Sequence, residues 1–179
     1  MHALEVDRHA DVYAQWGETY AQVAELVGRV RAEAARRGRK IRFSPSLRPI
    51  LAGTEAKAWD RADDTLARAR AGAEKNNSFR NPPPENTGSQ RLLAAAAQGA
   101  RSDKHPWTGI AGLLGAQGSS TALVGTPDQV ADALLDCHDL GIIMFLIRGS
   151  YSLQDAIDSG RDLLPLTRDL IARRRPKAA

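Results

Sequence analysis

The stretch at residues 121–171, TALVGTPDQVADALLDCHDLGIIMFLIRGSYSLQDAIDSGRDLLPLTRDLI, decides the fold class of this chain. Its first five residues are apolar enough for a short strand. Thr126-Pro127-Asp128-Gln129 then forms a capping box, in which the Thr hydroxyl accepts from an amide of the first turn and the Gln side chain reaches back. Apolar residues continue at helical spacing to Leu140, and Gly141 tolerates the positive φ of a helix end. The pattern predicts a strand at 121–125 and a helix that begins at Thr126.

The residues after this helix predict a second strand and a closing helix. The run at 142–147 is apolar without alternation, which is typical of a strand covered on both faces in a parallel sheet. Arg148-Gly149-Ser150 ends the run, so we expect Arg148 at the carboxyl end of a strand. Ser152 opens a further helix with its own apolar stripe. Strands that alternate with helices in this way indicate an α/β protein.

The first half of the chain repeats the same order. Residues 11–16 and 41–51 are rich in strand-forming residues, and each run is followed by a segment with helical spacing of apolar residues. Pro45 and Pro49 each remove a backbone donor from the second strand. We therefore expect that strand to be bulged or to have one side open.

The pattern changes between Gly72 and about Pro106. Asn, Pro and Gly residues interrupt regular structure there, apart from a short helix expected over 90–98. A long irregular stretch inside a compact domain is typical of a lid or a mobile segment. We place a mobile insertion at about 72–120.

Length and composition exclude several classes of protein. A chain of 179 residues with 42% hydrophobic residues can bury the core of one domain. Its single cysteine excludes an internal disulfide, and no apolar run approaches the roughly 20 residues that span a bilayer. Charged residues interrupt the start of the chain, which does not resemble a signal peptide. We expect a cytoplasmic protein without a membrane partner.

Two further kinds of partner are not expected. The net charge is +4, but 25 basic residues are interspersed with 21 acidic ones, so a nucleic-acid site is not indicated. The dense basic run at 173–177 is typical of a solvated tail. The four histidines and Cys137 show no metal-ligand spacing, and we expect no metal site.

Several runs along the chain carry a family resemblance. The runs lie at 9–18, 43–51, 88–91, 121–127, 139–141, 145–149, 155–156 and 160–161. Taken together and in this order, they resemble the carboxyl-terminal end of the luciferase-like, flavin-dependent monooxygenases, especially the alkanesulfonate monooxygenase branch.

The resemblance implies a partial (β/α)8 TIM barrel. A complete barrel needs about 250 residues. Residues 1–179 would supply its last three βα units, with the insertion placed before the penultimate helix. Three strands cannot close a barrel, and their open edges would expose unpaired backbone. We therefore expect a truncated or split gene product whose missing part precedes Met1, with a complementing chain or a homo-oligomer supplying the missing edge.

The resemblance also implies an activity. In this family, reduced FMN supplied by a separate flavin reductase activates oxygen, which is transferred to a small organic substrate. The resemblance to the alkanesulfonate branch implies an alkanesulfonate or another organosulfur compound as that substrate. The alternative is a non-catalytic, truncated subunit or remnant that pairs with a full-length homologue.

Candidate catalytic residues follow from the barrel rule that chemistry lies at the carboxyl ends of strands. Arg48, Arg148 and Tyr151 would orient the substrate and stabilise negative charge. For Arg48, the alternative is an outward side chain on a frayed strand. For Arg148, it is a salt bridge to Asp155 or Glu18.

Candidate cofactor-binding residues lie at the same rim and in the insertion. Trp16 and Ser46 follow from strand ends, while Gln90 and Arg91 could fold over a flavin or a substrate anion. The alternative for Gln90 and Arg91 is a solvated helix face.

Three parts of the chain depart from the pattern of the alkanesulfonate branch. That branch carries Arg and then His at the positions of Ser46 and Arg48, and its mobile-loop Arg falls near 116–117. Its Tyr after the last strand is matched by Tyr151 only with a slip of one residue. These departures indicate a different substrate or no catalysis.

Overall fold

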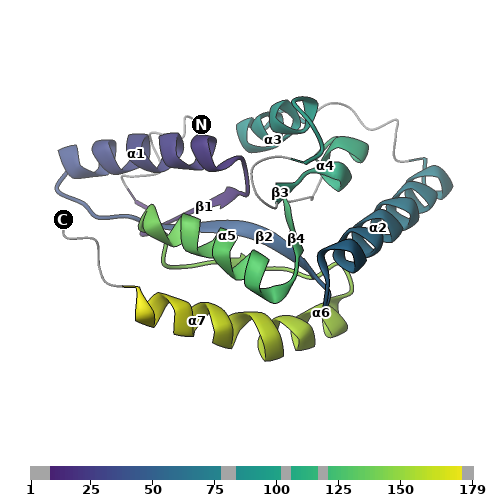
Figure 1. The fold of residues 1–179 in the computed structure, drawn as a ribbon. Helices are drawn as coiled ribbons and strands as arrows, with labels where there is room; N and C mark the ends of the chain where they lie inside the picture. The colour runs from purple at the N-terminus through teal and green to yellow at the C-terminus, as the bar shows by residue number, and fades with distance from the viewer. Residues whose placement is uncertain (1–8, 78–83, 102–105, 117–120, 175–179) are drawn as a thin grey trace.

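The computed structural model of this protein describes residues 9–77, 84–101, 106–116 and 121–174. Figure 1 shows α1, α5 and α7 lying along a curved sheet, with α2, α3 and α4 grouped at the other end of the molecule. The elements, in chain order, are β1 (Val12–Trp16), α1 (Tyr20–Arg36), β2 (Arg42–Leu51), α2 (Glu55–Lys75), α3 (Thr87–Ala97), β3 (Pro106–Trp107), α4 (Gly109–Leu113), β4 (Ala122–Gly125), α5 (Pro127–Asp139), β5 (Leu146–Ile147), α6 (Ser152–Asp158), a π-helical turn η3 (Ser159–Leu163) and α7 (Leu164–Arg173).

The long strand β2 is the centre of the sheet, and two parallel strands share one of its edges. The Gly17 amide donates to the Ser46 carbonyl at 3.2 Å, and the Arg48 amide donates to the Thr121 carbonyl at 3.0 Å. Backbone groups two residues apart point to the same edge of a strand. β1 therefore covers the first half of this edge and β4 covers the second half.

β5 pairs in parallel with the opposite edge of β2, where the Arg148 amide donates to the Leu47 carbonyl at 3.0 Å. In the described part of the chain, no strand pairs with the outer edge of β1 or of β5. The result is a curled, open sheet of parallel strands with helices outside it, as expected for part of a barrel.

The predicted strand at 142–147 is much shorter in the structure. Only Leu146–Ile147 pairs with β2, and the side chains of Ile143 and Leu146 are 65% and 50% exposed. The backbone nitrogen of Pro45 faces the same edge as Leu47 but has no hydrogen to donate. The expectation of a six-residue strand covered on both faces is therefore wrong, because β2 offers few donors on that side.

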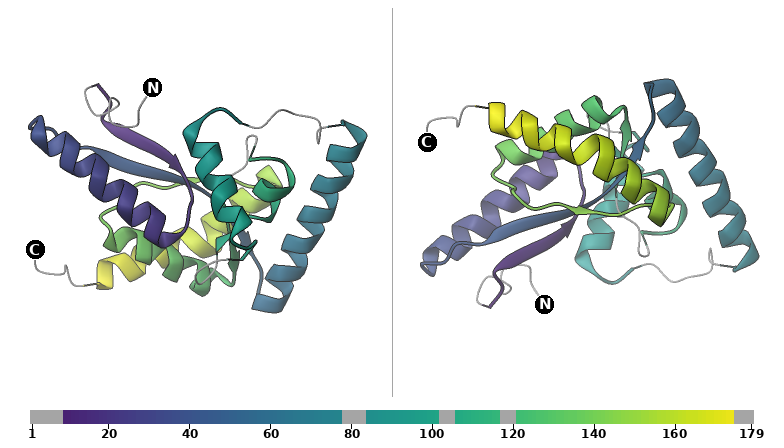
Figure 2. Two further views of the ribbon diagram at one scale, coloured as in Figure 1. Left: turned by 90° about the horizontal axis from the view of Figure 1, so that it is seen from above. Right: turned by 90° about the horizontal axis from the view of Figure 1, so that it is seen from below.

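The two faces of the sheet differ in what covers them. The outward side chains Phe43 and Leu47 are buried, Phe43 in a cluster with residues of α1 and Leu47 in one with residues of α5. Figure 2 shows these helices outside the strands from two further directions. Residues at alternate positions, such as Ser44 and Ser46, point to the opposite, inner face.

The insertion is more regular than its sequence indicates. The Asn and Gly residues at 86–88 predict an interruption of regular structure. In the structure, however, the Asn86 side chain accepts from the Ser89 amide at 2.8 Å and caps α3. Leu92 is then fully buried in a cluster with residues of α4 and Trp16. Residues 78–83, 102–105 and 117–120 of the predicted insertion lie outside the described residues, and its mobility stays a prediction.

Candidate functional site

A large cavity of about 930 Å³ lies on the inner face of the sheet. The start of α3 and Arg91 form one wall, and side chains of β1, β2 and β5 form the other. Residues 13–16 all line it in succession, so the cavity also follows the free edge of β1. Cavities of roughly 300–1,000 Å³ are typical of small-molecule and cofactor sites.

The inner wall is built by residues in register across three strands. Trp16 lies opposite Ser46, and Ser46 lies opposite Leu146. Ser46 is 5% exposed, and its hydroxyl has no hydrogen-bond partner among the described residues. A buried, unpaired hydroxyl costs about 1–3 kcal/mol. It is therefore a ready contact for a bound ligand.

Arg48 lies two residues beyond Ser46 in β2, and its side chain is therefore on the same inner face of the sheet. Its Nη1 donates to the Gly149 carbonyl at 2.9 Å, so the half-buried guanidinium is turned toward the turn after β5. Burial, and then the positive charge of Arg148, lower the pKa of Arg48 from its ordinary value, while Asp155 acts in the opposite direction. The two arginines are thus close enough to repel each other.

Arg148 follows β5 directly and lines the cavity with an exposed side chain. The two carboxylates considered as its partners are engaged elsewhere, since Glu18 pairs with Arg91 and Asp155 pairs with Arg61. Within the described ranges, Arg148 has no ion pair. Its charge is therefore available to a ligand.

Tyr151 is placed away from this cavity. Its ring lies under the Arg68 guanidinium of α2, at 5.3 Å from the ring centroid. Its backbone amide donates to Asp155 Oδ2 at 2.7 Å. The structure brings Arg48 and Arg148 together, but it turns the Tyr151 ring toward α2.

The two candidates in the insertion also separate. Arg91 lines the cavity and binds Glu18 through Nε at 2.9 Å and Nη2 at 2.6 Å, and this hydrogen bonding raises the pKa of Arg91. Gln90 is exposed, and its amide donates to the Pro84 and Glu85 carbonyls. Arg91 is thus held in an ion pair and does not lie on a solvated helix face. Gln90 instead bonds to backbone carbonyls just before the start of α3.

Two acidic residues that the sequence suggested only as partners of Arg148 organise the site through other arginines. Glu18 and Asp155 are both 8% exposed, and each binds an arginine from a distant part of the chain. Asp155 lies in the first turn of α6, where acidic residues are common, and this signal could have been used. No local signal identifies Arg61 or Arg91 as the partners.

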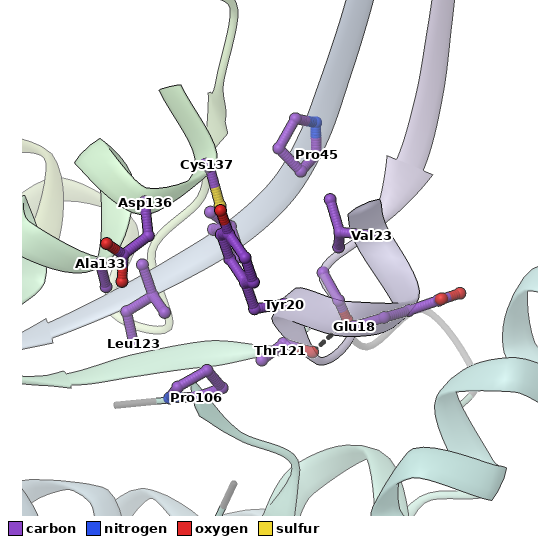
Figure 3. Close-up of a pocket in the computed structure, with 12 residues that line it drawn as sticks. Glu18, Tyr20, Val23, Pro45, Pro106, Thr121, Leu123, Ala133, Asp136 and Cys137 are labelled. Carbon is purple, nitrogen blue, oxygen red and sulfur yellow. Dashed lines mark hydrogen bonds between the residues drawn. The ribbon is translucent and has the colours of Figure 1, made fainter. Parts of the chain in front are cut away.

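A second, much smaller cavity of about 50 Å³ lies on the outer side, between α1 and α5. Figure 3 shows the Tyr20 ring between Cys137 and Thr121, whose hydroxyl donates to the Gly17 carbonyl. Burial, and then the charge of Asp136, raise the pKa of the Cys137 thiol to about 11. This thiol is neutral at physiological pH.

Cys137 should therefore react slowly with a thiol reagent in the folded protein. The thiolate is the reactive form. We expect the rate with iodoacetamide to be about 100-fold lower at pH 8 in the native protein than in urea, and to rise as the pH approaches 11. Mass spectrometry of quenched samples measures the rate. Equal rates in native and unfolded protein would contradict this assignment.

The described residues contain no cluster of three or more His, Cys, Asp or Glu that could hold a metal ion. Over the same residues, no helix combines the length and apolar character needed to cross a membrane.

Comparison with known proteins agrees with the curled, open sheet. The model of the luciferase-like monooxygenase family matches residues 6–143. This chain therefore belongs to the luciferase-like monooxygenases, and its open sheet corresponds to part of their barrel.

Solved structures show the same partial match. A riboflavin lyase (RcaE), solved with modified FMN and riboflavin, has a TM-score of 0.64 at 20% identity over 98% of this chain and 42% of its own. EDTA monooxygenase (EmoA) from Chelativorans sp. BNC1 has a TM-score of 0.60 at 19% identity, over 98% and 46%. A coenzyme F420-dependent tetrahydromethanopterin reductase from Methanopyrus kandleri gives 0.52 at 14%, over 92% and 47%. The chain spans less than half the length of these relatives.

Proposed function

We propose that this chain forms part of the active-site barrel of an FMN-dependent, two-component monooxygenase that acts on a small organic anion. The observation that carries the proposal is the pair Arg48 and Arg148, brought together where β5 ends beside the second half of β2. Barrel enzymes bind substrate at this end of their strands. Separate reductase supply of the flavin and a cytoplasmic location belong to the same proposal.

The residues of the inner face suit a flavin. Trp16 offers an aromatic surface, and the buried hydroxyl of Ser46 needs a hydrogen-bond partner. These two residues would hold FMN, with Arg91 fixed on the opposite wall of the cavity by Glu18. When bound, the flavin supplies the activation of oxygen, which protein side chains cannot perform. The FMN in the riboflavin lyase structure supports FMN over F420 as the first flavin to test.

The two arginines suit the anionic group of a substrate. A guanidinium presents a planar fork of donors that matches a sulfonate or a carboxylate. Arg48 donates to the Gly149 carbonyl, which keeps it beside Arg148, and Arg148 is exposed to the cavity, so an anion bound there would meet both positive charges. An alkanesulfonate or another organosulfur anion is the substrate class that we propose. Tyr151 would contribute through the turn in which it lies.

Binding of reduced FMN tests the cofactor. We expect anaerobic equilibrium dialysis to detect binding to the 179-residue chain mixed with an amino-terminal barrel half of a luciferase-like monooxygenase, and weaker binding to the chain alone. Trp16→Leu should weaken binding by up to about tenfold, through loss of one aromatic contact. Trp59→Phe is the control, because Trp59 of α2 packs in a different cluster, with residues of β2 and β4. If reduced FMN binds neither the mixture nor the chain alone, the proposal of enzymatic activity is wrong.

The alternative function is a non-catalytic subunit that pairs with a full-length homologue. It is favoured by the free edges of β1 and β5, and by the Gln15 side chain, whose buried oxygen and nitrogen have no partner among the described residues. Light scattering coupled to gel filtration tests it. A stable monomer that also binds FMN would rule this alternative out.

A further inference from the structure

The turn that follows β5 is held by one carboxylate. Asp155 Oδ2 accepts from the Ser150 amide at 2.6 Å and from the Tyr151 amide at 2.7 Å. Gly149 packs directly on this carboxylate, because a Cβ at Gly149 would lie 2.7 Å from the Asp155 Cβ. A larger residue at 149 would push the turn away from α6.

The other oxygen of Asp155 connects the turn to the end of β2. Asp155 Oδ1 accepts from Arg61 Nη2 at 2.8 Å, and Arg61 Nη1 donates to the Leu51 carbonyl at 2.7 Å. Asp155 is 8% exposed, so these bonds are largely shielded from water. Hydrogen bonds to a charged group are stronger than those between neutral groups, so these bonds hold the turn firmly against β2 and α2.

The same turn sets the positions of both arginines of the proposed substrate site. Arg148 immediately precedes it, and the Gly149 carbonyl accepts from Arg48 Nη1 at 2.9 Å. A displacement of the turn would therefore move the Arg148 side chain and remove the acceptor of Arg48. Both oxygens of Asp155 are engaged by the turn amides and by Arg61, so the carboxylate makes no ion pair with Arg148 among the described residues.

We infer that Asp155, anchored by Arg61, is a positioning residue that holds Arg48 and Arg148 together for binding of an organic anion. The inference rests on the proposed function, because it assumes that the arginine pair binds substrate. It adds two residues, one on α2 and one on α6, that do not touch the ligand but set the geometry of those that do.

A titration with methanesulfonate tests the inference in the full chain. The readout is the NMR signal of the arginine side-chain Nε–Hε groups, which reports weak binding at Arg48 and Arg148. Asp155→Asn should lower the affinity about tenfold and shift the Ser150 and Tyr151 amide protons, because the charged acceptor is lost. Asp158→Asn is the matched control, because Asp158 contacts the same Arg61 at 3.5 Å but makes no bond to the turn. It should bind within about twofold of the native protein.

Two further variants separate positioning from general stability. In an Arg148→Gln background, adding Asp155→Asn should lower the affinity for methanesulfonate by less than about twofold further, because one of the groups to be positioned is gone. Arg61→Gln should weaken binding about threefold, since it removes one of the three bonds to Asp155. If Asp155→Asn does not fold, Arg61→Gln tests the positioning role in its place.

The possible failures are distinguishable. If the native protein shows no response to methanesulfonate, the proposed substrate class is wrong. In that case the free-state Nε–Hε signal of Arg48 still tests positioning, and an unchanged signal in Asp155→Asn would overturn it. If the native protein binds, equal losses in Asp155→Asn and Asp158→Asn, or no loss in either, would overturn the inference.

Discussion

Replacing Arg91 by Met should lower the free energy of unfolding by about 2–3 kcal/mol. Glu18 has a side chain that is 3% exposed, and its carboxylate is paired by Arg91 through two donors. Removing one partner of a buried pair leaves an uncompensated charge, which typically costs 3–5 kcal/mol. We take a lower value because the Arg91 side chain is 26% exposed, and water can reach part of the pair. Urea unfolding followed by circular dichroism measures the change.

Two controls separate the charge from the packing of the side chain. The double variant Glu18→Gln/Arg91→Met removes both charges and should recover at least half of the lost stability. Arg29→Met breaks an exposed pair with Glu25 on α1 and should cost less than about 0.5 kcal/mol. If Arg91→Met is no more harmful than Arg29→Met, the pair does not fasten α3 to the end of β1.

The parts of the fold that sequence predicts well are those fixed by neighbouring residues. The capping box predicted at Thr126 is present, with the Thr126 hydroxyl accepting from the Gln129 amide, and Thr19 and Gln22 form a second box with the same spacing. The predicted helix ends just before Gly141, and the φ of Gly141 is 77°. Capping and helix termination involve residues within one turn, so the local sequence contains the necessary information.

The parts that sequence does not predict depend on residues far apart. The length of β5 depends on Pro45, about 100 positions earlier, and the apolar run at 142–147 contains no sign of it. The start of α3 depends on whether Asn86 caps a helix or ends one, and the burial of Leu92 against a distant cluster decides this. Tertiary packing here overrides local preference.

The candidate site divides in the same way. The position of Arg148 at a strand end follows from the break in an apolar run, and parallel pairing then brings it beside Arg48. The choice of ion-pair partners does not follow, because Glu18 and Asp155 could each have paired with any nearby arginine. The structure shows that both are engaged by other arginines, which leaves Arg148 without an ion pair among the described residues.

Arg48→Gln and Arg148→Gln should each weaken methanesulfonate binding by roughly 10- to 100-fold. Each substitution removes a charged donor, and hydrogen bonds to charged groups contribute about 1.5–3 kcal/mol. Gln retains a hydrogen-bonding amide but loses the charge and the forked geometry of the guanidinium. NMR titration of the 179-residue chain measures both affinities.

The affinity losses caused by the two substitutions should not be additive. The pKa of Arg48 is lowered by burial and by Arg148, which shows that the two positive charges disfavour each other without a ligand. An anion relieves this repulsion only when both arginines are present, so the double variant should lose less affinity than the sum of the single losses. Arg161→Gln is the control, because this exposed arginine pairs with Asp162 on η3. Equal affinity in Arg48→Gln, Arg148→Gln and Arg161→Gln would show that the arginine pair is not the anion site, and the proposed substrate class would then lose its basis.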